Sequence, residues 1–251
     1  MSTYLEERIQ WYDDNYRNGN ALISDAQFDQ LENNLKRVSP NCDYFTNKKA
    51  LPLPSLPKDQ IEEFIEGLLP DTRLIVEPKI DGCAIALQYR DGKLEKAISR
   101  KGTDCTDKIA KVPDVPTTVK VQGLFQVRGE LYAPAEYDRP SYSQRQAGGY
   151  LRSRDSKSDH LSFAAFQIIN GKLNQHDSLK YLKKLGFTTP EYKSCNFTSQ
   201  VEMYRKQWSD KKLFTNYPTD GIVVKINSRK LQLIREKSYG QYPHWAMAIK
   251  Y

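Results

Sequence analysis

The first forty residues carry apolar side chains at the spacing of amphipathic helices. Thr3-x-x-Glu6 and Ser24-x-x-Gln27 have the form of capping boxes. We therefore expect one helix from Thr3 to about Tyr16 and a second from Ser24, separated by Gly19-Asn20. The apolar face of the second helix consists of Phe28, Leu31 and Leu35.

Beyond residue 60 the pattern changes to short apolar runs and alternation, which are typical of strands. Strands are predicted at 74–76, 84–89, 94–99, 125–132, 161–169, 220–227 and 244–251. Asp91-Gly92 is a strong turn signal for a hairpin between the second and third of them. Helices are predicted at 61–69, 179–185 and, capped by Ser199-x-x-Glu202, from 199 to about 214; residues 144–155 are expected to form a basic loop.

This order of elements predicts an α+β protein with three parts. They are a small helical domain (1–48), a proline-rich linker (49–58) and a larger domain of strands and helices (59–251). Long apolar runs, a signal-peptide pattern and Cys-x-x-Cys spacing are missing, so we expect a soluble, cytoplasmic protein without a zinc site or disulfide framework.

The net charge of +7 is unevenly spread along the chain. Residues 1–40 carry four Lys or Arg and seven Asp or Glu, so the rest of the chain carries about +10. A basic body suits a polyanionic partner such as nucleic acid, although a merely soluble basic protein has the same composition.

The stretch Val76–Gly82 places a lysine and two acids between predicted strands. Unpaired charges are costly to bury, so a functional role is favoured over a solvated turn. Glu77 and Asp81 lie two residues on either side of Lys79, and alternation points all three side chains the same way.

A lysine in this setting is a candidate nucleophile. An amine attacks phosphorus only when neutral, and at the reference pKa only about one lysine in a thousand is neutral near pH 7.5. A second cation about 5 Å away opposes the charged form by ~3 kcal/mol, which lowers the lysine pKa. The chemistry therefore predicts that further basic residues converge on Lys79.

Five segments in order resemble the motifs of NAD-dependent DNA ligases. They are Glu77-Pro78-Lys79-Ile80-Asp81-Gly82, Ser99-Arg100, Val127-Arg128-Gly129-Glu130, Asp220-Gly221-Ile222-Val223-Val224-Lys225 and Trp245-Ala246-Met247-Ala248-Ile249-Lys250-Tyr251. The resemblance implies a nucleotidyltransferase domain of the DNA ligase and mRNA capping type, with the nucleotide between antiparallel sheets.

The resemblance also implies roles for single residues. The catalytic set would be Lys79, Asp81, Glu130, Lys225 and Lys250, with the last two lysines on the α-phosphate as the converging cations. Glu77, Arg100 and Glu130 would contact the nucleotide, and Phe166 would stack on adenine, although core packing also explains a single Phe. NAD⁺ and Mg²⁺ are the implied cofactors; the metal ligands are open, and Glu130 is one candidate.

Residues Ile23–Asp29 resemble the small domain that grips the nicotinamide mononucleotide half of NAD⁺ in these ligases. The implied contacts are Tyr12, Tyr16, Asp25, Phe28 and Asp29, with Phe28 where the family has tyrosine. A helical hairpin with a solvated acidic face is the alternative. Ser55-Leu56 matches a family pair beside the nucleotide, and a plain linker explains it equally well.

Arg145, Arg152 and Arg154 match a basic family segment that contacts nucleotide or DNA phosphates, with Gln146 in place of asparagine. A solvated basic loop remains an alternative for each. Residues 101–106 depart from the family's glycine-rich segment at this point.

The implied activity is adenylation of Lys79 from NAD⁺, followed by transfer of AMP to the 5′-phosphate of nicked DNA. The alternatives are an ATP-dependent DNA or RNA ligase, a capping-type enzyme, or a nucleic-acid-binding subunit with a dead nucleotide site. In the family an OB-fold follows the motif of Lys250, so we expect either an excised domain or the A subunit of a split, phage-type ligase. The start at Met1 favours the split enzyme, whose partner would carry the OB-fold.

Overall fold

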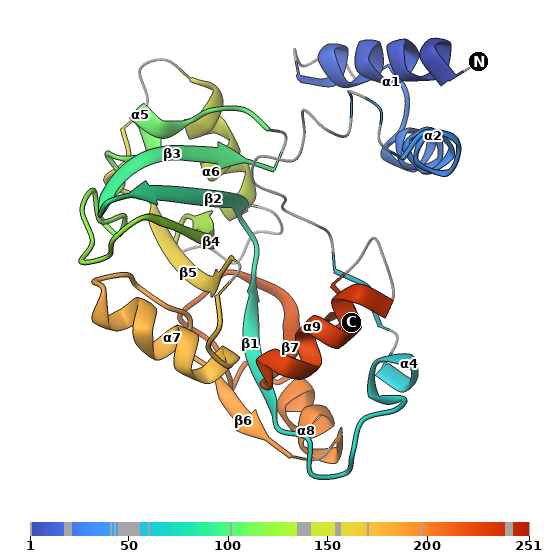
Figure 1. Cartoon of the computed structure of the whole chain (residues 1–251). Helices are drawn as coiled ribbons and strands as arrows, with labels where there is room; N and C mark the ends of the chain where they lie inside the picture. The colour runs from blue at the N-terminus through green and yellow to red at the C-terminus, as the bar shows by residue number, and fades with distance from the viewer. Residues whose placement is uncertain are drawn as a thin grey trace. The chain divides into compact units, whose positions relative to one another are not determined.

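The computed structural model describes residues 2–17, 22–40, 42, 44, 56–59, 61–100, 102–134, 142–153, 157–169, 171–196, 198–238 and 243–250. The chain divides into two compact units, Met1–Pro52 and Leu53–Tyr251 (Figure 1). Among the described residues, none of the helices is long and apolar enough to cross a membrane.

The described residues of the N-terminal unit include the helices α1 (Ser2–Arg17) and α2 (Asp25–Val38). The predicted capping box opens α2, because the Ser24 hydroxyl accepts from the Gln27 backbone and the Gln27 side chain accepts from the Ser24 backbone. The predicted apolar face of α2 is confirmed by a small core around Ile9, Leu35 and Tyr44.

The other predicted capping box is wrong. Helix α1 begins at Ser2, so Thr3 lies inside the helix and cannot be its N-cap. The carboxylate of Glu6 instead accepts from the backbone N–H of Tyr44 at 2.8 Å and holds the segment after α2. The expected break at Gly19-Asn20 lies outside the described residues.

The described residues of the larger unit form two four-stranded antiparallel sheets, which confirms the architecture that the resemblance implied (Figure 1). Seven of the eight strands were predicted, and the short strand at 193–195 was not. The first sheet has the order β6-β1-β7-β8, with β1 (Leu74–Ile80), β6 (Lys193–Cys195), β7 (Thr219–Ile226) and β8 (Ala246–Ile249). The second has the order β3-β2-β4-β5, with β2 (Cys83–Arg90), β3 (Lys93–Ser99), β4 (Leu124–Tyr132) and β5 (Ser162–Ile168).

Each sheet turns one face to its own hydrophobic core. Val76 and Val224 pack into the core of the first sheet, and Val127 and Leu131 pack into that of the second. Because successive strand residues point to opposite faces, charged side chains at alternate positions of β1 and β4 lie on the other faces. Ile80, Tyr132 and Ala164 join the two sheets in a third small cluster.

Among the described residues of the larger unit, six helices accompany these sheets. They are α4 (Ile61–Ile65), α5 (Thr106–Ile109), α6 (Tyr142–Arg152), α7 (Gln175–Lys184), α8 (Thr198–Ser209) and α9 (Arg229–Ser238). Sequence patterns missed α5 and α9 and misplaced several ends. Helix α4 is shorter than predicted, and α7 begins four residues earlier. Helix α8 starts before Ser199, so Ser199 is not its N-cap, and it ends five residues earlier than expected.

The prediction of a loop at 144–155 is wrong, because residues up to Arg152 belong to α6. Ala147 and Tyr150 on one side of α6 are buried in the core of the second sheet. This burial outweighs the low helix propensity of Gly148 and Gly149.

The predicted linker is described only from Leu56 onward. There it joins the edge of the first sheet: Ala248 donates to the Pro57 carbonyl at 2.9 Å, and Asp59 donates to the Ala248 carbonyl at 3.0 Å. Leu56 packs against the core of that sheet. Residues 56–59 therefore form part of the larger unit rather than a free spacer.

Candidate active site

The sequence pattern predicted a strand that ends before Lys79. In the structure Lys79 lies within β1. The pairing of β1 with β7 is irregular between Pro78 and Ile80, so Lys79 has no partner residue in β7. Its ammonium donates to Asp220 Oδ1 at 2.6 Å, and the side chain is 24% exposed. A ligand therefore has access to an otherwise anchored lysine.

Asp220 joins two lysines through one carboxylate. Its Oδ2 accepts from Lys250 Nζ, also at 2.6 Å. Burial alone would raise the pKa of Asp220. Hydrogen bonds from Lys250 and Lys79 outweigh burial and hold this pKa below its ordinary value. The same hydrogen bond raises the pKa of Lys250.

The backbone around this group is fixed on both sides. A Cβ on Gly221 would lie 2.3 Å from the Ile249 carbonyl oxygen, so only glycine allows β7 and β8 to approach this closely. Asp59 accepts from the backbone N–H of Lys250 at 2.8 Å. Together these contacts place Lys250 beside Asp220.

Two further carboxylates face this group. Burial, followed by repulsion from Asp220, raises the pKa of Asp81, while Lys79 and Lys250 oppose that rise. Burial raises the pKa of Glu130 to about 8, and the charges of Lys79 and Arg100 oppose it. The charge of Lys79 thus acts on both carboxylates.

Gly82 allows β2 and β4 to approach at this point. A Cβ there would lie 2.2 Å from the Leu131 carbonyl oxygen and 2.9 Å from Glu130 Cγ. The glycine that follows Asp81 in the sequence is therefore needed for the position of Glu130.

A buried ion pair lies next to this group. Lys225 Nζ contacts Glu77 Oε2 at 2.7 Å, and the side chains are 6% and 2% exposed. Gln175 donates to the other Glu77 oxygen at 2.8 Å. Burial lowers the pKa of Lys225, and Glu77 opposes the shift. Lys225 is thus buried together with a carboxylate partner.

A bulge in β5 adds Phe166 to this pair. β4 pairs Arg128 with Gln167 and Gly129 with Ala165, which leaves Phe166 outside the ladder. Its carbonyl accepts from Gln175 Nε2 at 2.8 Å and from Lys225 Nζ at 3.3 Å. The ammonium of Lys225 lies 4.8 Å from the centre of the Phe166 ring.

The remaining sequence-predicted residues are not all brought to this group. Arg145 and Arg152 lie on α6 with exposed side chains, and the described residues give neither a hydrogen bond to the group around Lys79. Arg100 follows β3 and acts on Glu130 through its charge. Arg154 lies outside the described residues.

In the N-terminal unit, the Tyr12 hydroxyl accepts from Arg8 at 3.4 Å, and the Arg8 guanidinium lies 5.7 Å from the Tyr12 ring centre. Phe28 packs against the small core of this unit. The side chains of Tyr16, Asp25 and Asp29, and all of Ser55, lie outside the described residues.

Sequence reasoning missed two residues of the site. Asp220 stands in a motif that was recognised, and an acid at the start of a buried strand beside glycine is a usable signal. Gln175, which connects Glu77 with Phe166, lies in no motif, and only the fold brings it there.

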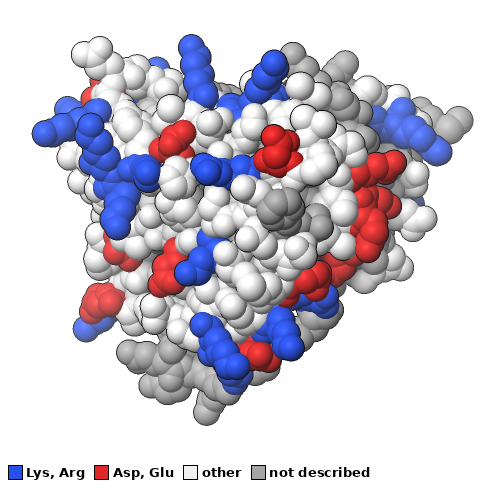
Figure 2. Space-filling model, turned by 90° about the horizontal axis from the view of Figure 1, so that it is seen from below, with Lys and Arg blue, Asp and Glu red and all other residues white. Residues whose placement is uncertain are grey.

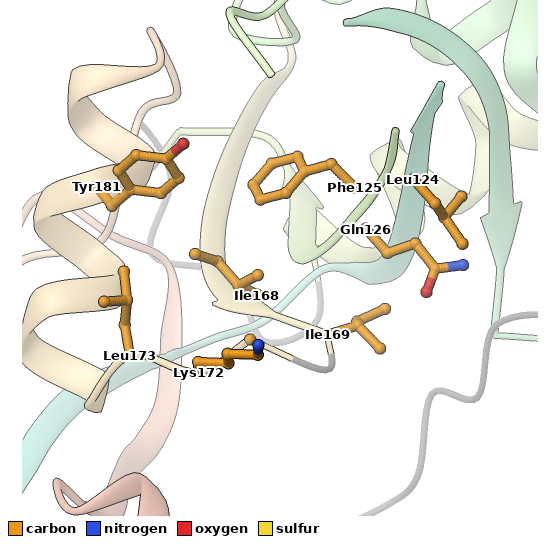
Figure 3. Close-up of a pocket in the computed structure, with 9 residues that line it drawn as sticks. Leu124, Phe125, Gln126, Ile168, Ile169, Lys172, Leu173 and Tyr181 are labelled. Carbon is orange, nitrogen blue, oxygen red and sulfur yellow. The ribbon is translucent and has the colours of Figure 1, made fainter. Parts of the chain in front are cut away.

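A hollow of about 290 Å³ lies between β4, the end of β5 and α7 (Figure 3). Phe125 and Tyr181 form part of its wall, with ring centres 6.4 Å apart. Its lining includes none of the charged residues around Lys79 and Lys225. The hollow is therefore distinct from the group of charged side chains that carries chemistry.

Two antiparallel sheets with a partly exposed lysine on one and a facing glutamate on the other define a nucleotidyltransferase domain of the DNA ligase and capping-enzyme type. Residues 57–251 match the family described as NAD-dependent DNA ligase adenylation domain. The chain belongs to this family.

The chain is similar to the DNA ligase of Pseudothermotoga lettingae, with 29% identity across 98% of this chain and 44% of that protein. It is also similar to the DNA ligase of Shouchella clausii, with 34% identity across 70% of this chain and 30% of that protein. The chain thus spans less than half the length of these relatives.

A solved structure described as Pmar-Lig_Pre. has a TM-score of 0.51 and 16% identity, covering 83% of this chain and 48% of that one. This likeness concerns the fold alone.

Proposed function

We propose that this chain performs the adenylation step of an NAD-dependent DNA ligase. The Lys79 nitrogen loses a proton and bonds to the adenylyl phosphorus of NAD⁺. The bond from that phosphorus to the bridging oxygen breaks, so nicotinamide mononucleotide leaves with the oxygen. The product is AMP held on Lys79 through a phosphoramidate.

The observation that supports this proposal is the shared carboxylate of Asp220, which holds Lys79 and Lys250 at 2.6 Å each. A nucleophile needs to be fixed beside the cations that stabilise the charge on the reacting phosphoryl group. In the proposal Lys250 moves from Asp220 to a phosphoryl oxygen, and Lys225 contributes charge from its buried pair.

Other residues would bind the rest of NAD⁺. Glu130 and Arg100 face the ribose and phosphates, Phe166 offers its ring to adenine, and Glu77 holds Lys225 in place. The N-terminal unit would take the nicotinamide mononucleotide half with Tyr12, Tyr16, Asp25 and Asp29. Phe28 and Leu56 would support the site through packing, since both contact hydrophobic cores.

Mg²⁺ fits this site in its usual mode, with few protein ligands and several contacts to substrate phosphate. Within the described part of the chain, no three His, Cys, Asp or Glu side chains converge as a cage for a metal. Glu130 is the carboxylate that would hold the ion, with Asp81 nearby. When bound, the ion would neutralise charge on the phosphoryl oxygens.

The second substrate in this proposal is nicked duplex DNA, whose 5′-phosphate accepts AMP. Arg145, Arg152 and Arg154 are candidate phosphate contacts. Figure 2 shows Lys and Arg spread over one face with Asp and Glu among them, not a single basic strip. Because the chain matches only 30–44% of two ligases, we propose that sealing also needs an OB-fold, in a further segment or a partner subunit.

The test is to mix the purified chain with NAD⁺ or ATP labelled in the adenylyl group and to measure protein-bound label. We expect a stable adduct from NAD⁺, loss of the adduct in Lys79→Ala, and retention in the matched control Lys93→Ala. Lys93 is an exposed lysine at the start of β3. An adduct from ATP alone would identify an ATP-dependent enzyme, and no adduct from either would indicate a binding subunit.

A further inference from the structure

Arg128 faces the same side of β4 as Glu130. Its neighbours Val127 and Leu131 both point into the core of the sheet, so alternation turns Arg128 and Glu130 to the opposite face. Two residues along a strand separate them by about 7 Å. Directly across on β2, the small residues Ala86 and Ala84 pair with Arg128 and Glu130.

The guanidinium of Arg128 is incompletely paired. Its Nη1 donates to Gln167 Oε1 at 3.0 Å, but its Nε is buried and has no hydrogen-bond partner. The described residues give it no carboxylate at ion-pair distance. Glu236, whose charge acts on it, contacts Arg229 at 3.8 Å and accepts from Trp245 at 3.3 Å. Buried donors without partners are rare and call for an explanation.

Arg128 also leaves an unbalanced positive charge near the buried ion pair. Arg128 donates to Gln167 and Lys225 donates to the carbonyl of the preceding residue, Phe166, so both cations contact the same part of β5. Glu77 neutralises Lys225 but not Arg128. Burial lowers the pKa of Arg128 to about 10, which still leaves the guanidinium charged at neutral pH.

On the basis of the proposed function, we propose that Arg128 selects the adenine half of NAD⁺. Its free Nε–H donates to an acceptor nitrogen of the neutral purine. Its positive charge disfavours the nicotinamide ring, which is itself a cation in NAD⁺. Arg128 would thereby ensure that the adenylyl phosphorus, and not the phosphorus of the nicotinamide half, faces Lys79.

The position of Arg128 agrees with this role. The phosphate must lie at Lys79, near Glu130, and the base must extend away from it. Arg128 lies two residues from Glu130 on β4, beside the bulge that leaves Phe166 outside the ladder. A charged donor next to an aromatic ring is suited to a purine, which offers both a flat face and ring acceptors.

The test compares AMP with nicotinamide mononucleotide, two probes that carry the same phosphate but rings of different charge. Binding is measured by calorimetry for the wild type, Arg128→Met, Arg128→Lys and the matched control Arg90→Met. Arg90 is an exposed arginine of the same sheet that contacts Glu95 at 2.9 Å.

We expect Arg128→Met to weaken AMP binding roughly 10- to 100-fold, as for a lost charged hydrogen bond, and to reduce the preference for AMP over nicotinamide mononucleotide. Arg128→Lys should also bind AMP weakly but still reject nicotinamide mononucleotide. Arg90→Met should behave as the wild type. A folded Arg128→Met with an unchanged preference would overturn the inference.

If Arg128→Met fails to fold, an NMR experiment on the wild-type protein tests the inference instead. In ¹⁵N-labelled protein, AMP should shift the Nε–Hε signal of Arg128, and an unchanged signal at saturating AMP overturns the inference. The adduct assay keeps this separate from the proposed function. If the wild type forms AMP adduct while Arg128→Met retains its preference, only the role of Arg128 fails. If the wild type forms no adduct, the proposed function fails.

Discussion

The buried pair of Glu77 and Lys225 offers the sharpest test of the site's energetics. Glu77→Gln keeps the shape of the side chain, removes its charge, and replaces one of the two oxygens that accept from Lys225 and Gln175 with a donor. The oppositely charged atoms are 2.7 Å apart, with side chains 2% and 6% exposed. At an effective dielectric of ~20 this separation corresponds to an attraction of roughly 6 kcal/mol, part of which offsets the loss of hydration.

Loss of one partner from such a pair leaves an uncompensated buried charge and typically costs about 3–5 kcal/mol. We therefore expect Glu77→Gln to lower the free energy of unfolding by that amount. Urea denaturation followed by tryptophan fluorescence is a suitable assay, because Trp208 and Trp245 lie in the core of the same sheet. With a urea slope of about 3 kcal/mol per molar, the midpoint should fall by about 1 M or more.

Two variants control this measurement. Glu95→Gln breaks the exposed pair with Arg90 and should change the midpoint far less. Glu77→Gln combined with Lys225→Met removes both charges and should recover much of the lost stability. A Glu77→Gln midpoint equal to that of the wild type, or a double variant less stable than the single one, would refute the electrostatic account.

Three further predictions concern the same site. Folding raises the Glu130 pKa from 4.5 to about 8, so between these pH values the folded state binds a proton that the unfolded state has lost. The contribution of Glu130 to stability therefore falls as pH rises from about 4.5 to 8. Glu130→Gln should flatten that part of a curve of unfolding free energy against pH. Gly82→Ala should impair folding or adduct formation, because its Cβ would lie 2.2 Å from a backbone oxygen. Gly149→Ala in α6 is the control: a Cβ there meets open space, so thermal unfolding should show the protein stabilised by up to about 1 kcal/mol. Asp220→Ala should slow adduct formation at least roughly tenfold in a rapid-quench assay while leaving the circular dichroism spectrum unchanged, because both lysines lose their anchor; a wild-type rate would show that Asp220 is dispensable.

The sequence predicted seven of the eight described strands, because apolar runs and alternation both indicate residues buried in a sheet. It missed the three-residue β6, and it failed at α6, where a basic loop was expected but packing of Ala147 and Tyr150 in the core supports a helix. Sequence patterns also placed Lys79 after its strand, because Glu77 and Lys79 interrupt the apolar run of β1 with charge. Periodicity does not distinguish a strand end from a strand that lines a site.

The site itself was only partly predictable. The lysines and Glu130 could be found because charges inside apolar runs are unusual. The joint anchoring of Lys79 and Lys250 by Asp220, and the Gln175 contact that connects Glu77 with Phe166, depend on pairings between distant strands and helices. The incomplete pairing of Arg128 likewise follows from its position on β4 in three dimensions, since its sequence neighbours give no sign of it.

The most direct test of the central claim is to locate the covalent adduct. The chain is incubated with NAD⁺ and Mg²⁺, digested, and the modified peptide is identified by mass spectrometry under conditions that preserve phosphoramidates. The account predicts AMP on the nitrogen of Lys79 and nowhere else, together with one nicotinamide mononucleotide released per adduct. AMP on another residue, or a Lys79 peptide that stays unmodified while NAD⁺ is consumed, would contradict it.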